Sequence, residues 1–132
     1  MIWYMNKIIL DSDFLYGLFI PSDPHYTNCQ NLAERIEQDQ LLISNLVIYE
    51  IITLLSRRFD QKTAITVVEQ IEGLEQTRII IDEKLDIEIL KEFSKYSKKN
   101  ISAVDCSNLV LAKKYKAKIA SFDEFYPQEY LA

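Results

Sequence analysis

The sequence predicts an α/β fold in which a central, mostly parallel β-sheet is flanked by helices on both faces. Short apolar runs alternate along the chain with longer segments in which apolar residues recur at helical spacing. This order of elements builds parallel sheets with crossover helices. Only two Gly and three Pro occur in 132 residues, so we expect helix to dominate.

The individual elements follow from local signals in the sequence. The first strand, Lys7–Leu10, leads into a short apolar segment that the Pro-containing stretch 21–24 interrupts. Ser44 and Asn45 are suitable caps for the apolar-rich helix that follows them, and Gly73 is a helix stop. The expected strands cover residues 7–10, 41–43, 78–81 and a run that ends near 121, and the expected helices cover residues 26–38, 46–58, 61–72, 83–98 and 102–115.

Length and composition are those of one folded domain over residues 1–132. Hydrophobic residues make up 48% and charged residues 27%, as is typical of globular proteins. Cys29 and Cys106 lack metal-ligand spacing and are expected to be reduced thiols. Residues 1–7 lack the features of a signal peptide, and no apolar run approaches the roughly 20 residues that span a bilayer. We therefore expect a cytoplasmic protein, and the sequence leaves open whether Met1 or Met5 is its start.

The net charge of −5 argues against a surface that coats nucleic acid, because non-specific phosphate binding depends on Lys and Arg. It does not exclude a nuclease, since divalent cations would offset several acids. The lysines are concentrated in two segments, where they either face solvent or guide a phosphate backbone toward an acidic pocket. They are Lys91, Lys95, Lys98 and Lys99, followed by Lys113, Lys114, Lys116 and Lys118.

Four widely spaced acids lie where this fold would bring them to one end of the sheet. Asp11 directly follows the first apolar run, and Asp123 follows the run 119–122. Ligand sites of open parallel sheets lie at the carboxyl ends of the strands. Glu50 and Asp105 fall within predicted helices. The four acids together predict a site for divalent cations, which prefer oxygen ligands.

Three of these acids also have local structural explanations. Asp11 is able to cap the following helix. Asp105 stands three residues after Ser102 and so fits the acidic position of a capping box. Asp123 is able to initiate a turn. Each explanation concerns one acid, whereas a joint site accounts for the whole set.

Glu50 has a different alternative explanation. It lies within the apolar segment 46–52, where helical spacing groups it with Thr53 and Arg57. That group is either an exposed polar stripe on a mostly buried helix or, for Glu50, part of the acidic site. A carboxylate beside so much apolar surface is destabilising unless a cation or hydrogen-bond donors compensate it.

Four segments, in order along the chain, resemble the motifs of PIN-domain ribonucleases, and within these the VapC-like toxins of bacterial and archaeal toxin–antitoxin pairs. In that family an acid ends the first strand, a Glu lies on a central helix and a third acid starts a later helix. A further Asp follows the fourth strand, two residues after a Ser or Thr. The resemblance covers essentially the whole chain, although each motif is short. The segments are residues 9–13, 44–55, 104–112 and 120–123.

The resemblance implies a single PIN-like domain that hydrolyses RNA with one or two Mg²⁺ or Mn²⁺ ions, leaving 5′-phosphate and 3′-hydroxyl ends. It also implies a homodimer and a cognate antitoxin. Asp13 stands where relatives often carry Asn or Ser, so it either adds a carboxylate or contacts a metal through water. By motif, the catalytic and metal-binding acids are Asp11, Glu50, Asp105 and Asp123, of which Asp11 and Asp105 are expected to hold the principal ion, and the supporting residues are Ser12, Asp13 and Ser121.

Other classes of protein share parts of this pattern. Asp11-Ser12-Asp13 also resembles the opening of haloacid-dehalogenase-like phosphatases, but that family continues with Gly and Thr where this chain has Phe14-Leu15. A phospho-acceptor receiver domain would need an acceptor Asp after the third strand and a Lys after the fifth. A non-catalytic binding module of PIN-like fold is the remaining alternative, and metal-dependent cleavage distinguishes it from an enzyme.

Several residues have weaker claims to function. His25, the only histidine, lies in a Pro-containing loop, where a packing role is favoured over a general base. Cys106 has no evident base partner, which argues against a nucleophilic thiol. Tyr49 and Tyr115 are expected to be structural.

Overall fold

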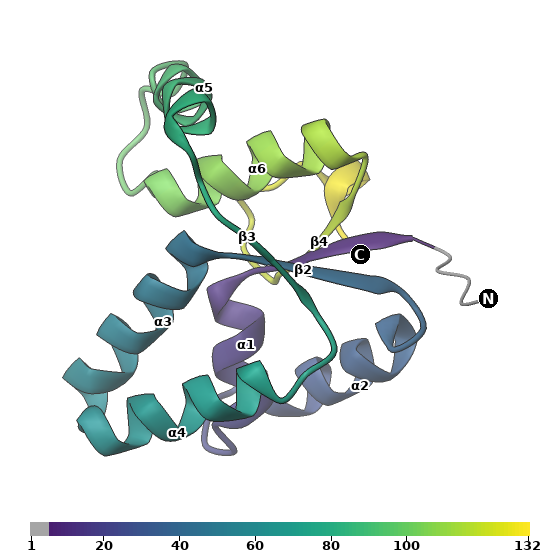
Figure 1. The fold of residues 1–132 in the computed structure, drawn as a ribbon, viewed down its shortest axis with the longest axis vertical. Helices are drawn as coiled ribbons and strands as arrows, with labels where there is room; N and C mark the ends of the chain where they lie inside the picture. The colour runs from purple at the N-terminus through teal and green to yellow at the C-terminus, as the bar shows by residue number, and fades with distance from the viewer. Residues whose placement is uncertain (1–5) are drawn as a thin grey trace.

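The computed structural model describes residues 6–132, which form a four-stranded sheet between two groups of helices (Figure 1). The expectations for the first five residues, including the choice between Met1 and Met5, lie outside this range. Every strand pairing is parallel, so the predicted α/β class is confirmed. The strands are β1 (Lys7–Leu10), β2 (Gln40–Ser44), β3 (Thr77–Ile79) and β4 (Lys118–Ala120), and the helices are α1 (Ser12–Phe19), α2 (Tyr26–Ile36), α3 (Asn45–Arg58), α4 (Gln61–Glu72), α5 (Glu83–Phe93), α6 (Ala103–Tyr115) and the short 3₁₀ helix η1 (Gln128–Tyr130).

Strand β1 pairs with β2 on one side and β4 on the other, and the sheet order is β3-β2-β1-β4. Ile9 lies opposite Leu42 on β2 and Ile119 on β4. Just beyond the strand ends, the Asp11 N–H donates to the Ala120 carbonyl at 3.1 Å. The residues that follow β1 and β4 therefore begin at the same edge of the sheet, as the sequence predicted.

The two faces of the sheet carry separate hydrophobic cores. Ile8 and Leu10 pack with residues of α1 to α4, whereas Ile9 packs with residues of α5 and α6. This division follows from the alternation of side chains along a strand. In Figure 1, helices α1 to α4 lie on one side of the sheet and α5 and α6 on the other. The prediction of helices on both faces is confirmed.

Most helix ends agree with the local signals. Ser44 caps α3, Gly73 ends α4, and the unassigned segment after β1 is helix α1. Helix α5 ends at Phe93 rather than near residue 98, because the N–H groups of Lys95 and Tyr96 bond to carbonyls three residues back and tighten the chain into turns. No helix within residues 6–132 combines the length and apolar character needed to cross a bilayer.

Candidate carboxylate site

Asp11 is buried at the carboxyl end of β1, with 2% of its surface exposed. Its Oδ1 accepts a hydrogen bond from the Ser12 N–H at 2.8 Å, so Asp11 does cap α1. The same oxygen accepts a bond from Asn108 Nδ2 at 2.9 Å, and Oδ2 accepts one from the Tyr126 hydroxyl at 3.0 Å. The Asp11 carboxylate therefore caps α1 and at the same time contacts α6, through Asn108, and the segment after β4, through Tyr126.

Asp105 meets Asp11 through the hydroxyl of Tyr126. Asp105 lies in the first turn of α6, and its Oδ1 is 3.1 Å from the same Tyr126 oxygen. A phenol has one hydrogen and donates to one carboxylate at a time, so the other needs a proton or a cation. The predicted capping box is half formed: Ser102 Oγ accepts from the Asp105 N–H at 3.4 Å, whereas the Asp105 carboxylate bonds to Tyr126.

The crowding of carboxylates changes their acidity. Burial, followed by the charge of Asp13, raises the pKa of Asp11 to about 7. Burial, followed by the charges of Asp11 and Asp123, raises the pKa of Asp105 to about 8. Burial also raises the pKa of the Tyr126 phenol, with the two nearby aspartates adding to the effect. The site holds more negative charge than its own hydrogen-bond donors compensate, which is the electrostatic condition for cation binding.

Glu50 joins the site through Ser12. Glu50 is half-buried on α3, and the Ser12 hydroxyl donates to its Oε1. Ser12 directly follows Asp11, so this bond ties α3 to the end of β1. Glu50 is therefore bonded to Ser12 and only half-buried, whereas Thr53 and Arg57 on the same helix are exposed.

Ser121 connects the two remaining acids at the end of β4. Its hydroxyl donates to Asp13 Oδ2 at 3.1 Å and accepts from the Asp123 N–H at 3.0 Å. The Phe122 N–H also donates to Asp13 Oδ2, at 2.9 Å. Asp123 is exposed, and its Oδ1 accepts from the Phe125 N–H at 2.9 Å, so it does initiate a turn. Two donors at the end of β4 therefore bond to Asp13, which lies on α1.

The donor chemistry of this cluster suits a hard divalent cation. Asp13 Oδ1 is buried and has no hydrogen-bond partner, so one carboxylate oxygen lacks compensation. As the side chains stand, no three His, Cys, Asp or Glu residues within residues 6–132 are grouped closely enough to hold a metal ion. Within the cluster, Asp11 and Asp105 are the two acids that meet at one hydroxyl, that of Tyr126.

A family model described as PIN domain matches residues 8–127. This chain belongs to the PIN-domain family. The match includes all four acids that the motifs single out, so the resemblance noted in the sequence is confirmed at the level of the family. A comparison with curated proteins gives no match.

Two solved structures are similar to this PIN domain. The Mycobacterium tuberculosis toxin VapC20, described as cleaving the sarcin-ricin loop, has a TM-score of 0.81 at 18% identity, with 89% of this chain and 91% of that chain covered. VapBC2 from Rickettsia felis, bound to a DNA fragment from its promoter, has a TM-score of 0.61 at 17% identity, with coverages of 89% and 88%. At these identities the likeness shows a shared fold, so the prediction of a PIN-like α/β domain is confirmed.

Two residues of the PIN domain's site were missed in the sequence. Asn108 is fully buried and donates to Asp11, and it also lies 3.1 Å from the Tyr126 hydroxyl. Its position three residues after Asp105 places both on one face of α6, a spacing that could have identified it. Tyr126 lies between β4 and η1 in irregular chain, where no periodic pattern marks it.

Several lysines of the two lysine-rich segments lie around one hollow of the PIN domain. Five lysines line a hollow of about 520 Å³ between α5 and α6, together with Glu88, Glu92 and Val110. Glu92 is 5% exposed, and its Oε1 lies 3.3 Å from Lys113 Nζ and 3.5 Å from Lys95 Nζ. The hollow is therefore basic at its rim and is built around one buried carboxylate. The lysines are Lys84, Lys91, Lys95, Lys113 and Lys114.

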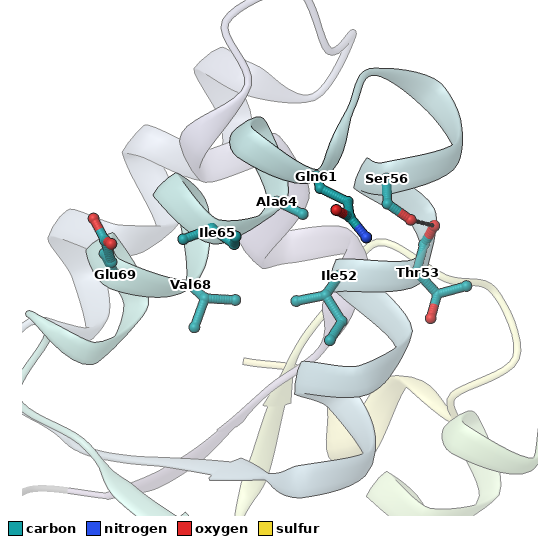
Figure 2. A pocket seen from close by; sticks show the side chains of 8 residues that line it. All are labelled: Ile52, Thr53, Ser56, Gln61, Ala64, Ile65, Val68 and Glu69. Atoms are coloured by element: carbon teal, nitrogen blue, oxygen red, sulfur yellow. Dashed lines mark hydrogen bonds between the residues drawn. The ribbon is translucent and has the colours of Figure 1, made fainter.

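A second hollow, of about 490 Å³, lies between α3 and α4 (Figure 2). Figure 2 shows apolar side chains from both helices, including Ile52, Ile65 and Val68, along this hollow. None of the four acids lines it. The chemistry predicted from the sequence belongs to the sheet edge and not to this apolar surface.

The residues with weaker claims also have defined surroundings. His25 is exposed and stacks on Phe122, with ring centroids 4.9 Å apart, which is the packing role expected for it. Burial raises the pKa of the Cys106 thiol to about 11, which disfavours the reactive thiolate. Tyr115 packs against the core beneath α5 and α6. Tyr49 is 59% exposed and so lies outside the core of this chain.

Proposed function

We propose that this PIN domain is a metal-dependent endoribonuclease. The observation that carries the proposal is the meeting of Asp11 and Asp105 at a single hydroxyl oxygen, 3.0 and 3.1 Å from their carboxylates. Membership of the PIN-domain family adds support. In the reaction, a water oxygen attacks phosphorus and the bond from phosphorus to the 3′-oxygen breaks. The products carry a 5′-phosphate and a 3′-hydroxyl.

The proposed cation site uses the four acids predicted by motif. Asp11 and Asp105 would hold the principal Mg²⁺ or Mn²⁺ ion, with Glu50 and Asp123 completing the set of ligands directly or through water. The ion would supply positive charge for the phosphate and make the attacking water more acidic. Asp13, whose Oδ1 has no partner, is a further candidate ligand.

Neighbouring residues would keep these acids in position. Asn108 fixes Asp11 by donating to its Oδ1. Ser12 orients Glu50, and Ser121 holds Asp13 beside the turn that carries Asp123. The match of the PIN-domain family model to residues 8–127 argues against the phosphatase alternative.

We further propose that the protein acts as a single domain, as the toxin of a toxin–antitoxin pair, in the cytoplasm. Support comes from the similar fold of VapC20, a toxin, and of VapBC2, a complex bound to promoter DNA. A cognate antitoxin and a homodimer are proposed on the same grounds. The target RNA is a question for experiment.

The test is cleavage of a pool of cellular RNA by purified protein with Mg²⁺ or Mn²⁺, with the fragment ends mapped by sequencing. Asp105→Asn and EDTA should each abolish the cuts. Asp86→Asn, at an exposed acid on α5, removes the same charge away from the site and should cleave normally. Cuts with 5′-phosphate ends that vanish only in Asp105→Asn and EDTA support the enzyme. Metal binding without cleavage of any RNA would favour a non-catalytic module.

A further inference from the structure

A third hollow, of about 610 Å³, opens beside the carboxylate cluster. Val104, the residue before Asp105, lines it from α6, and the rest of its lining belongs to α3. The α3 residues are spaced three or four apart, so they share one face of that helix. They are Leu46, Tyr49, Glu50, Thr53, Leu54 and Arg57. The hollow is therefore continuous with the cluster through Glu50.

Arg57 supplies a positive charge at the far end of this face. Seven residues of α-helix separate it from Glu50, or about 10 Å along the axis. Arg57 is exposed, and it forms no ion pair among residues 6–132. The neighbouring Arg58 differs: its Nη1 lies 3.4 Å from the Tyr16 hydroxyl, and its guanidinium lies 5.5 Å from the Tyr16 ring centroid. Only Arg57 of this pair is available to a ligand in the hollow.

Tyr49 supplies an aromatic surface at the other end. It precedes Glu50 and is 59% exposed. Its backbone carbonyl accepts a bond from Thr53 Oγ1 at 2.8 Å, one turn further along the same face. An exposed aromatic ring next to an apolar lining is suited to stacking against a nucleobase.

We propose that this hollow binds single-stranded RNA beside the cleaved bond, with Arg57 on a backbone phosphate and Tyr49 stacked on a base. The assignment rests on the proposed ribonuclease function. RNA is favoured over a protein segment because a strand lying along this face leads directly to Glu50 and Asp105. A guanidinium also matches the geometry of a phosphate, and its contact with one releases counterions.

The probe is a fluorescein-labelled, ten-nucleotide oligoadenylate, with affinity measured by anisotropy in Mg²⁺ at several salt concentrations. All proteins carry Asp105→Asn to prevent cleavage. Arg57→Ala should weaken binding and lower the slope of log affinity against log salt by about 0.7, the value for one single-strand phosphate. Tyr49→Ala should weaken binding about tenfold with the slope unchanged, and Tyr49→Phe should bind normally because it keeps the ring.

Arg58→Ala is the control for loss of one positive charge and should keep the wild-type slope. Thermal midpoints within about 2–4 °C of the parent exclude a folding defect. Equal salt slopes for Arg57→Ala and Arg58→Ala, or unchanged affinity in Tyr49→Ala, would overturn the inference. Binding of a protein segment to this face would not rescue it. Cleavage is measured separately with the wild-type protein, which keeps Asp105. If the wild type does not cleave cellular RNA and the Asp105→Asn parent does not bind the probe, the ribonuclease proposal itself fails. If the wild type cleaves RNA and the Arg57 and Tyr49 variants bind like the Asp105→Asn parent, only the assignment of this hollow fails.

Discussion

Tyr126 donates a hydrogen bond from its buried hydroxyl to Asp11, a residue 115 positions earlier in the chain, at 3.0 Å. Because Asp105 shares that hydroxyl at 3.1 Å, one hydrogen serves two carboxylates. The phenol hydrogen therefore compensates only one of the two acids at a time. A cation bound by both acids would compete with this hydroxyl for them.

Replacement of Tyr126 by Phe keeps the ring and removes this donor. Two buried carboxylates then lose a partner, so we expect the free energy of unfolding in EDTA to fall by about 1–3 kcal/mol. Added Mg²⁺ should stabilise Tyr126→Phe more than the wild type, because no hydroxyl has to be displaced. Thermal unfolding with and without Mg²⁺ measures both effects. Tyr130→Phe is the control, and an equal Mg²⁺ response in all three proteins would contradict this account.

The raised pKa values predict how stability depends on pH without metal. Unfolded aspartates lose their protons near pH 3.8, whereas the pKa is about 7 for Asp11 and about 8 for Asp105 in the folded protein. Between these values the folded state binds more protons than the unfolded state, so rising pH favours unfolding. We expect the free energy of unfolding in EDTA to fall by roughly 2–4 kcal/mol from pH 5 to pH 8.

Urea denaturation at several pH values tests this dependence. Asp105→Asn should flatten the profile, because it removes one of the two coupled carboxylates. Saturating Mg²⁺ should also flatten it, because metal-bound carboxylates, like those of the unfolded chain, carry no proton in this pH range. Asp86→Asn, at an exposed site, should retain the wild-type slope. A metal-free protein whose stability rises steadily from pH 5 to pH 8 would be incompatible with the crowded carboxylates.

The four acids should contribute unequally to cation binding. Asp11→Asn and Asp105→Asn alter the two carboxylates that meet at Tyr126, so we expect each to weaken Mg²⁺ or Mn²⁺ affinity most, by at least about tenfold. Glu50→Gln should have a smaller effect because Glu50 reaches the cluster through Ser12. Asp123→Asn should also have a smaller effect, because Asp123 is exposed. Isothermal titration calorimetry measures each affinity; equal affinity in Asp11→Asn, Asp105→Asn and wild type would refute the assignment.

Replacement of Glu92 by Gln should lower the stability of the fold and raise its affinity for RNA. Its buried carboxylate bonds to Lys113, Lys95 and the Tyr96 hydroxyl, so Glu92→Gln should lower the free energy of unfolding by about 1–3 kcal/mol. The same change removes one negative charge from the lysine-lined hollow, so affinity for oligoadenylate should rise at low salt. Glu83→Gln, at an exposed position of α5, should change stability little. Unchanged RNA affinity in Glu92→Gln would mean that the lysine-lined hollow between α5 and α6 does not contact RNA.

The sequence predicted those parts of the site that depend on local pattern. Apolar runs located the strands, and the acids after Leu10 and Phe122 followed from the strand ends. Asn108 was within reach of the same reasoning, since helical spacing pairs it with Asp105. Tyr126 was not, because irregular chain has no period and its contact with Asp11 joins residues 115 positions apart.

Tertiary contacts also explain features that the sequence did not predict. Helix α5 is shorter than its amphipathic pattern because the chain turns after Phe93 and places Tyr96 against Phe125, with ring centroids 5.1 Å apart. Tyr49 lies outside the core, because the hollow beside Glu50 leaves it exposed. The sheet order β3-β2-β1-β4 depends on which strands meet in space, and no single segment encodes it.

The long sequence separation between Asp11 and Tyr126 affects when the site forms. Contacts between distant parts of a chain close late in folding, because the intervening loop must first be ordered. The cluster needs residues from β1, α3 and α6 as well as the segment after β4. During synthesis, the carboxylate cluster therefore cannot be complete until residue 126 has left the ribosome. The site then forms after the strands and helices that precede Tyr126 have been synthesised.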